Sequence, residues 1–216
     1  MNSISKKIYI SSKNAILGAV NSDVNIYSIY TINDKRSQNI IAEIDEYKYY
    51  DIDDILNYAK EKNEKPFIVL LDEIEDPYNL GSIIRTAVAG GCHGIIIKSK
   101  NACEVNSTVI KVSSGTAFNI MISKVNNISK TIDYLKENNL WIVGADMGGD
   151  TVYNIDLKGT TCLVVGNEGS GISRLVREKC DYICSIPMTD YAESLNVSNA
   201  TSIMIYEILR QNRYGK

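Results

Sequence analysis

Features that mark several protein classes are scarce in this sequence. It holds one histidine, and its five cysteines form no C-x-x-C pair, so few residues are available for a metal site. No apolar run approaches the roughly 20 residues that a membrane-spanning helix needs. The first residues, MNSISKKIYISSKN, lack the long apolar stretch of a signal peptide. We therefore expect a cytoplasmic protein that keeps its cysteines reduced, binds no metal and spans no membrane.

The lack of a signal peptide also decides how two motifs near the C-terminus are interpreted. Asn-x-Ser/Thr triplets begin at Asn196 and at Asn199, and each matches the N-glycosylation pattern. Because nothing directs the chain to a glycosylating compartment, we do not expect glycans there. These polar residues need another explanation.

Net charge is low as well. The chain of 216 residues has a formal net charge of −3, with 23% charged and 44% hydrophobic residues. This composition is typical of a soluble globular protein with one large or two small domains. It excludes a broad basic surface, but a local basic patch is compatible with an acidic average. Composition therefore neither requires nor excludes nucleic acid as a partner.

Short apolar runs and amphipathic stretches alternate in the first 62 residues. Strands are predicted at 7–10 and 25–32, and helices at 11–22, capped by Ser12, at 34–47 and at 51–62. The charged run EKNEK, followed by Pro66, is the best linker in the chain. It predicts a small α/β domain over residues 1–64 and a second domain over 65–216.

From Phe67 onward, strands and helices alternate strictly. Strands are predicted at 67–72, 94–98, 119–125, 141–146, 161–168 and 182–188, and helices at 81–91, 106–115, 128–139, 173–180 and 195–213. The first of these strands, FIVLLD, is an almost unbroken apolar run, as expected when both faces are buried. The alternation predicts an α/β fold with a mostly parallel sheet covered on both faces.

Three polar loops follow predicted strands, at the sheet edge where open α/β folds bind ligands. In the first, DEIEDPYNLGSIIRTA (72–87), Asn79 stands where a helix cap is expected. Asn79, Ser82 and Arg85 recur every three residues and form a polar ridge beside the apolar stripe. A capped helix with a solvated arginine is the alternative interpretation.

The second loop, VVGNEGSGIS (164–173), has three glycines between a strand and a helix. Such a loop lets the backbone approach a ligand. The phosphate-loop pattern G-x-x-x-x-G-K-[ST] is absent, because Ile172 and Ser173 follow Gly171. Glu168 in the middle of the loop would repel a phosphate. It favours a cationic or hydroxyl-bearing ligand.

The third loop, SIPMTDYAES, leads into the last helix, which begins near Leu195 or Asn196. Ser194 or Asn196 is the expected cap. Because this helix is apolar nearly all round, it should be mostly buried, and the polar groups at its start must find partners. Those partners are either structural or a ligand.

Together the three loops resemble a known family. DPYNLGSIIRTA, LVVGNEGSGIS and SIPMTDYAESLNVSNA look like the three ordered motifs of the SpoU-type (TrmH-like) RNA ribose 2′-O-methyltransferases of the SPOUT superfamily, over roughly residues 66–213. The resemblance implies an α/β knot, a mostly parallel sheet with a deep trefoil knot in its C-terminal part. It also implies S-adenosylmethionine as cofactor, a homodimer and an RNA substrate.

The resemblance assigns the site residues. Its catalytic positions match Asn79, Arg85, Glu168, Ser194 and Asn196. Its cofactor positions match Gly166, Ile186 and Leu195, joined by Gly144, Asn167, Gly169, Ser194 and Asn196. Arg85 stays protonated in nearly any setting, so it is better suited to binding a phosphate and stabilising an alkoxide than to removing a proton. Glu168 and Asn79 are expected to orient it. The chemistry requires no metal.

The chain departs from the family pattern at three positions. Asp190 replaces the usual glycine, Asn199 replaces a small apolar residue, and Tyr78 stands where histidine is common. None of them is a proposed catalytic position. These departures put the shape of the loops in question rather than the activity.

The N-terminal region resembles the small α/β RNA-binding domain of relatives that act on ribosomal RNA. YISSKNAILGAV looks like its first turn and helix, with Ser12 where glycine is usual, but later strands are missing and the domain is abbreviated. The chain also lacks the basic C-terminal extension of some tRNA-directed relatives. The expected substrate is therefore 23S ribosomal RNA, with tRNA as the alternative.

Three further functions remain as alternatives. A non-catalytic RNA-binding or ribosome-assembly protein would keep the fold, but Arg85 and Glu168 are both present. A nucleotide-binding enzyme would use the glycine loop to bind phosphate, but Glu168 in that loop would repel it. A superfamily member that methylates a base is less consistent with the set of Asn79, Arg85 and Ser194-Leu195-Asn196.

Overall fold

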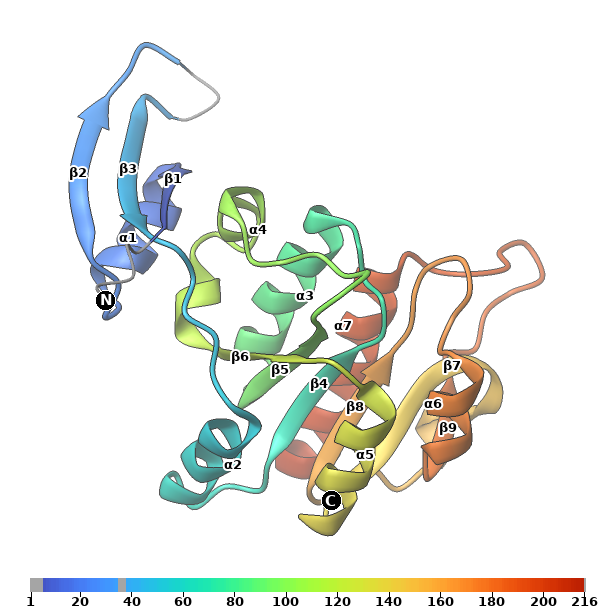
Figure 1. Ribbon diagram of the computed structural model, residues 1–216. Helices are drawn as coiled ribbons and strands as arrows, with labels where there is room; N and C mark the ends of the chain where they lie inside the picture. The colour runs from blue at the N-terminus through green and yellow to red at the C-terminus, as the bar shows by residue number, and fades with distance from the viewer. Residues whose placement is uncertain (1–5, 35–37, 216) are drawn as a thin grey trace.

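A computed structural model describes residues 6–34 and 38–215 (Figure 1). The N-terminal part is a three-stranded antiparallel sheet in the order β1-β3-β2, with one helix against it. Its elements are β1 (Lys7–Ser11), α1 (Lys13–Val20), β2 (Ile26–Thr31) and β3 (Ile40–Asp45). Ser12 caps α1 as predicted, accepting a hydrogen bond from the backbone of Ala15. Its φ of 91° lies in the left-handed region, which glycine favours.

The predicted helix over 34–47 is wrong for the residues that the structure describes, since residues 40–45 form β3; residues 35–37 lie outside the described part. β3 pairs with β1 on one side and β2 on the other. Ala42 and Ile44 are fully buried, whereas Glu43 and Asp45, which alternate with them along the strand, are only partly buried. This alternation, stabilised by pairing on both edges, overrides the helical spacing that the sequence also offers.

The larger sheet has six strands in the order β6-β5-β4-β8-β7-β9, and every neighbouring pair is parallel. The predicted parallel α/β sheet is thereby confirmed. Its strands are β4 (Phe67–Leu71), β5 (Gly94–Lys98), β6 (Met121–Val125), β7 (Trp141–Thr151), β8 (Thr161–Val165) and β9 (Tyr182–Ser185).

Helices cover both faces of this sheet (Figure 1). One layer holds α3 (Pro77–Ala89), α4 (Ser107–Val112) and α7 (Val197–Leu209), and the other holds α2 (Ile52–Glu61), α5 (Ile128–Glu137) and α6 (Arg174–Lys179). Alternate strand residues supply the two cores: Val69 and Leu71 pack with the first layer, Ile68 and Leu70 with the second. Burial on both faces explains why the inner strands β4, β5 and β8 are mostly apolar.

Helix α2 packs on the six-stranded sheet. A Cβ at Gly94 of β5 would lie 2.6 Å from the side chain of Ile55, so the helix is in close contact with the sheet. The predicted division at residue 64 would assign α2 to the N-terminal domain. The division stays a prediction, and the packing of Ile55 places the helix itself with the larger sheet.

The N-terminal sheet and the larger unit share a continuous core. A Cβ at Gly18 of α1 would lie 2.6 Å from the carbonyl oxygen of Gly115, which precedes the short helix η2 (Thr116–Asn119). The Tyr47 hydroxyl donates to the Ile120 carbonyl over 2.8 Å. Figure 1 shows α4 between the three-stranded sheet and α3. The N-terminal unit is therefore packed onto the larger one.

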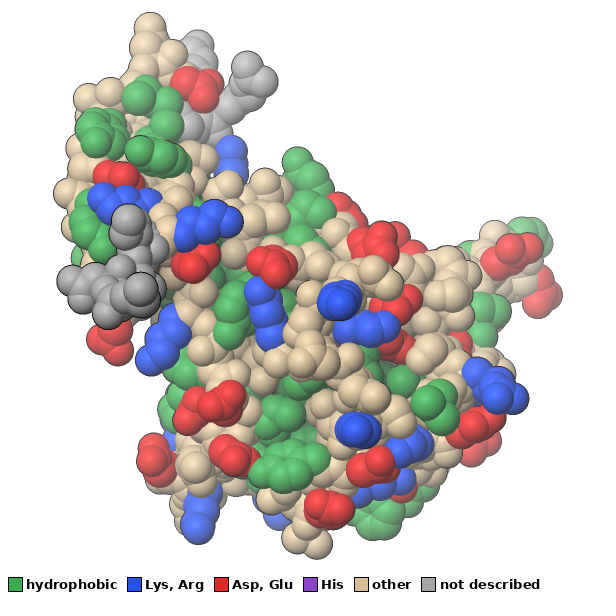
Figure 2. Space-filling view, in the orientation of Figure 1, with side chains coloured by type: hydrophobic (Ala, Val, Ile, Leu, Met, Phe, Trp, Pro, Cys, Tyr) green, Lys and Arg blue, Asp and Glu red, His purple; other side chains and the backbone are tan. Residues whose placement is uncertain are grey.

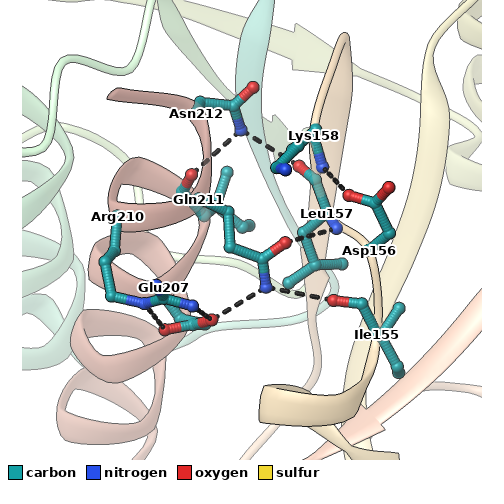
Figure 3. A network of polar contacts seen from close by, with 9 residues as sticks. Ile155, Asp156, Leu157, Lys158, Glu207, Arg210, Gln211 and Asn212 are labelled. Atoms are coloured by element: carbon teal, nitrogen blue, oxygen red, sulfur yellow. Dashed lines mark hydrogen bonds and ion pairs between the residues drawn. The ribbon is translucent and has the colours of Figure 1, made fainter. Parts of the chain in front are cut away.

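Polar side chains fix the C-terminal end of α7, where it continues into the π-helical segment η4 (Arg210–Tyr214) (Figure 3). Gln211 donates to the Ile155 carbonyl over 3.0 Å and accepts from the Leu157 backbone over 2.8 Å. It also donates to Glu207, which Arg210 binds through two hydrogen bonds. With this end attached to the loop before β8, the position of the start of α7 is restricted too.

Candidate functional site

A cavity of about 290 Å³ opens at the carboxyl ends of β8 and β9 and beside the middle of β7. It lies close to the lower end of the roughly 300–1,000 Å³ of small-molecule sites. Three segments line it: the bulge of β7 at 145–147, the glycine loop at 165–171 and the loop that joins β9 to α7. Residues from the second and third motifs therefore come together at one edge of the sheet.

Asn79, Glu168 and Asn196 form a hydrogen-bonded cluster beside this cavity. Asn79 Nδ2 donates to Glu168 Oε1. Asn196 Nδ2 lies 3.3 Å from the same oxygen and 3.1 Å from Asn79 Oδ1. Two amides from two helices thus converge on one carboxylate oxygen. The three motifs, one residue from each, meet here.

Local structure orients both amides. Asp76, not Asn79, is the N-cap of α3: its carboxylate accepts from the Asn79 backbone over 3.1 Å, and Pro77 follows at the first helical position. The predicted capping role of Asn79 is therefore wrong, and its side chain is available to Glu168. Asn196 is the cap of α7, as predicted, and its Oδ1 accepts from the Ser198 backbone over 3.0 Å.

The glycine loop closes on itself. Asn167 and Gly171 exchange two backbone hydrogen bonds of 3.1 and 2.8 Å, and the Gly169 backbone donates to the Asn167 side chain over 2.8 Å. A Cβ at Gly166 would lie 2.1 Å from the carbonyl carbon of Gly171. Three N–H groups of the loop are thus used internally. The loop is a poor cradle for a phosphate, which needs free N–H donors.

Arg85 lies apart from the cluster. Its side chain is exposed, and none of the described residues forms a hydrogen bond or ion pair with it. Six residues along α3 separate it from Asn79, which is about 9 Å along the axis and about 120° around it. The structure therefore does not bring Glu168 and Asn79 to Arg85 as predicted; they bind each other and Asn196 instead.

The predicted cofactor residues divide into two groups. Those that line the cavity are Gly166, Asn167, Gly169, Ile186, Ser194 and Leu195. Asn196 lies beside it in the amide cluster. Gly144 is not at the cavity: it is buried in β7, where a Cβ would lie 2.8 Å from Ile183 and 3.0 Å from Cys180. A glycine is needed there for packing against those side chains.

Sequence reasoning missed Asp146, which lines the cavity. Its carboxylate forms an ion pair with Arg177 of α6 and accepts from the Met147 backbone over 2.8 Å. An acidic residue directly after the apolar strand WIVGA was the available signal. Because Arg177 pairs with Asp146, Glu168 is the cavity carboxylate that no described cation neutralises. The cavity favours a ligand with positive charge.

Cys184 also lines the cavity, but as a neutral group. Burial raises the pKa of its thiol to about 11, with a smaller contribution from Asp150. A thiol in that state is an apolar wall rather than a nucleophile. Within residues 6–34 and 38–215, no three His, Cys, Asp or Glu side chains gather in a group able to hold a metal ion.

Comparison with known proteins agrees with these observations. A protein-family model, the SpoU rRNA Methylase family, matches residues 66–206. YacO of Bacillus subtilis (strain 168), assigned to the TrmH family of tRNA/rRNA methyltransferases, is 42% identical over 175 residues, which are 81% of this chain and 70% of that protein.

Solved structures share the fold. The SpoU methyltransferase AviRb from Streptomyces viridochromogenes, in complex with the cofactor AdoMet, matches with a TM-score of 0.81 and 27% identity, covering 95% of this chain and 90% of that one. The A. aeolicus TrmH/SpoU tRNA modifying enzyme matches with a TM-score of 0.62 and 30% identity, covering 73% and 83%. With the parallel sheet, these likenesses confirm the predicted fold class. For the part of the chain that the structure describes, no helix has the length and apolar character needed to cross a bilayer.

Proposed function

This chain belongs to the SpoU rRNA methylase family, and on that premise we propose that it transfers a methyl group from S-adenosylmethionine to a ribose 2′-oxygen of RNA. The observation that carries the proposal is the convergence of Asn79 and Asn196 on Glu168 beside the cavity. This cluster combines the residues that the ribose-directed relatives are expected to share.

The cavity fits S-adenosylmethionine. Val165, Ile186 and Leu195 offer apolar surface for an adenine ring, and the turns around them offer backbone polar groups. The uncompensated carboxylate of Glu168 suits a sulfonium cation. When bound, the cofactor supplies an electrophilic methyl group. We assign its binding to the glycine loop and to the loop that contains Ile186, Ser194 and Leu195.

We assign removal of the 2′-hydroxyl proton to Glu168. Its Oε1 receives both amides, whereas no described residue donates a hydrogen bond to Oε2. The two amides hold the carboxylate in one orientation, so that Oε2 stays available to an incoming hydroxyl. Removing the proton as the oxygen gains its methyl group is the step that this carboxylate can perform.

Arg85 is assigned to the RNA phosphate. Its guanidinium is exposed and unpaired among the described residues, about 9 Å along α3 from Asn79. That separation suits a phosphate next to the target ribose better than the proton transfer itself. A guanidinium binds phosphate oxygens in a bidentate manner, and its charge also stabilises developing negative charge nearby.

The proposed substrate is ribosomal RNA, with the 23S molecule favoured over tRNA. The family description and the resemblance of the N-terminal unit to an RNA-binding domain support this choice. We further propose that the three-stranded sheet within residues 1–64 holds RNA and that the chain acts as a homodimer. Maps of 2′-O-methylated positions in ribosomal RNA and tRNA, with and without the gene, test the substrate. Sedimentation tests the dimer.

Methyl transfer from labelled S-adenosylmethionine to total RNA tests the assignments. Glu168→Gln keeps the shape of the side chain but accepts a proton poorly, so we expect kcat to fall about 10²–10⁴-fold. Arg85→Ala should raise KM for RNA. Arg174→Ala, whose side chain is 91% exposed, is the matched control and should act as wild type. Equal activity of all four proteins would exclude both roles.

A second measurement separates the alternatives. Mass spectrometry of nucleosides after the reaction distinguishes a methylated ribose from a methylated base. A protein that binds S-adenosylmethionine in calorimetry and methylates no RNA would be the non-catalytic alternative. Failure to bind the cofactor at all would contradict the proposed function.

A further inference from the structure

The outer face of α3 carries an exposed stripe that starts beside the polar cluster. Tyr78 is 64% exposed, Arg85 and Ala89 are exposed, and Ser82 is partly buried. These residues are spaced by four, three and four positions, so they line one side of the helix. Tyr78 and Arg85 are the large side chains of the stripe, about 10 Å apart along the axis.

The neighbours of α3 show which way this stripe faces. Gly81 contacts α4, since a Cβ there would lie 2.7 Å from the Val112 side chain. Thr86 contacts α7 through a 3.1 Å hydrogen bond to Ser202. At 100° per residue, Tyr78 lies between these two contacts and on the side opposite the sheet. Its ring therefore faces outward, on the side of α3 that lies between the contacts with α4 and α7.

Tyr78 directly precedes a residue of the polar cluster. Asn79 is 8% exposed and points toward the start of α7, where Asn196 binds it. Tyr78 is turned by about 100° toward solvent. No described residue donates a hydrogen bond to its hydroxyl or packs a ring against it. A large aromatic ring thus stands unpartnered next to the residues assigned to the reaction.

We propose that Tyr78 is a positioning residue that stacks on an unpaired base of the RNA substrate, at or next to the methylated nucleotide. The inference rests on the proposed function, in which Arg85 binds the neighbouring phosphate. Aromatic side chains bind unpaired bases by stacking, and this contact tolerates different base identities. The ring of Tyr78 binds the base and Arg85 binds the phosphate backbone. The ribose between them is then positioned at Glu168.

Kinetics of Tyr78→Ala and Tyr78→Phe test the proposal. Loss of the ring should raise KM for ribosomal RNA about tenfold or more, with kcat nearly unchanged, while Tyr78→Phe retains the ring and stays close to wild type. The dissociation constant for S-adenosylmethionine should not change in either variant. Tyr206→Ala is the matched control, because that tyrosine is 50% exposed on α7. A Tyr78→Ala enzyme that behaves like the control would overturn the proposal, as would equal defects in the Ala and Phe variants.

A spectroscopic test does not depend on turnover. The probe is an unpaired RNA of about 16 nucleotides that contains 2-aminopurine, whose fluorescence is quenched by stacking. Wild type and Tyr78→Phe should quench it on binding, and Tyr78→Ala should not. Quenching that depends on Tyr78 in a protein without methyl transfer would contradict the proposed function but support the stacking. Equal quenching by the Ala variant would contradict the stacking alone.

Discussion

The two sheets of this protein are built on opposite principles. The inner strands β4, β5 and β8 of the six-stranded parallel sheet are buried on both faces, and most of their residues are apolar. The three-stranded antiparallel sheet buries one face and exposes the other, with Tyr9, Tyr27 and Tyr30 on its surface. Figure 2 shows a group of hydrophobic side chains on this N-terminal unit, with charges of both signs beside it and over the rest of that face.

This difference suggests that one sheet serves mainly stability and the other serves mainly contact with partners. A sheet buried on both faces holds loops at its edge rigidly, which a catalytic cluster requires. Exposed tyrosines contribute little to a core, but they are common where proteins meet other molecules. We therefore expect the larger sheet to dominate stability and cofactor binding, and the smaller one to contribute mainly to RNA binding.

The largest expected effect is in the core of the parallel sheet. Leu70→Ala removes a fully buried side chain and should lower the free energy of unfolding by about 2–5 kcal/mol. Ile29→Ala removes a side chain that is 52% exposed on β2 and should cost less than about 1 kcal/mol. Urea titrations of the two variants measure both. Equal losses would contradict the asymmetry between the sheets.

The next effect concerns the glycine loop. Gly166→Ala would force a Cβ to 2.1 Å from the backbone of Gly171 and displace the loop. The displaced loop should lower affinity for S-adenosylmethionine, and because a misplacement of about 1 Å costs on the order of 100-fold in reaction rate, methyl transfer should fall as well. Gly169→Ala should have a much smaller effect, because its nearest neighbour would lie at 3.5 Å. Calorimetry compares the two, and similar affinities would show that loop closure is unimportant.

A smaller effect is expected at the junction between the two units. Gly18→Ala would place a Cβ 2.6 Å from the carbonyl oxygen of Gly115 and should cost about 1–3 kcal/mol of stability. RNA affinity should fall while cofactor affinity stays the same, since no residue of α1 or of the segment around Gly115 lines the cavity. Leu17→Ala, at a residue that is 48% exposed on the same helix, serves as control. A loss of cofactor binding in Gly18→Ala would show that the units are coupled.

The smallest expected effect is a pH dependence of stability that arises from His93, next to the larger sheet. Burial lowers the pKa of His93, although the nearby negative charge of Glu64 acts in the opposite direction and raises it. The ring accepts from the Phe67 backbone over 3.1 Å, which requires an unprotonated Nδ1. As pH falls below about 6.5, the unfolded chain gains a proton that folded His93 resists, so stability decreases; above that pH it is unaffected.

His93→Gln removes this titrating group. Urea midpoints at about pH 8 and about pH 5.5 should therefore differ less in the variant than in wild type. The chain has one histidine, which simplifies the assignment. An unchanged difference between the two midpoints would assign the pH dependence to other groups.

Prediction from sequence succeeded where periodicity and burial agree. The parallel strands were found because continuous apolar runs are typical of strands buried on both faces. β3 was misread as a helix, because its residues fit helical spacing until pairing on both edges is known. Gly144 was placed in the cofactor site, whereas it packs against Ile183 inside the sheet. Asp146 was missed because no motif includes it.

By itself, the sequence determined that polar loops follow buried parallel strands, and that one of them carries Glu168 instead of a phosphate-binding lysine. These are local properties of pattern and residue type. Only the tertiary structure decided that amides of Asn79 and Asn196 meet on one oxygen of Glu168. It also turned Arg85 and Tyr78 outward, because the packing of α3 against the sheet, α4 and α7 leaves one side of that helix open.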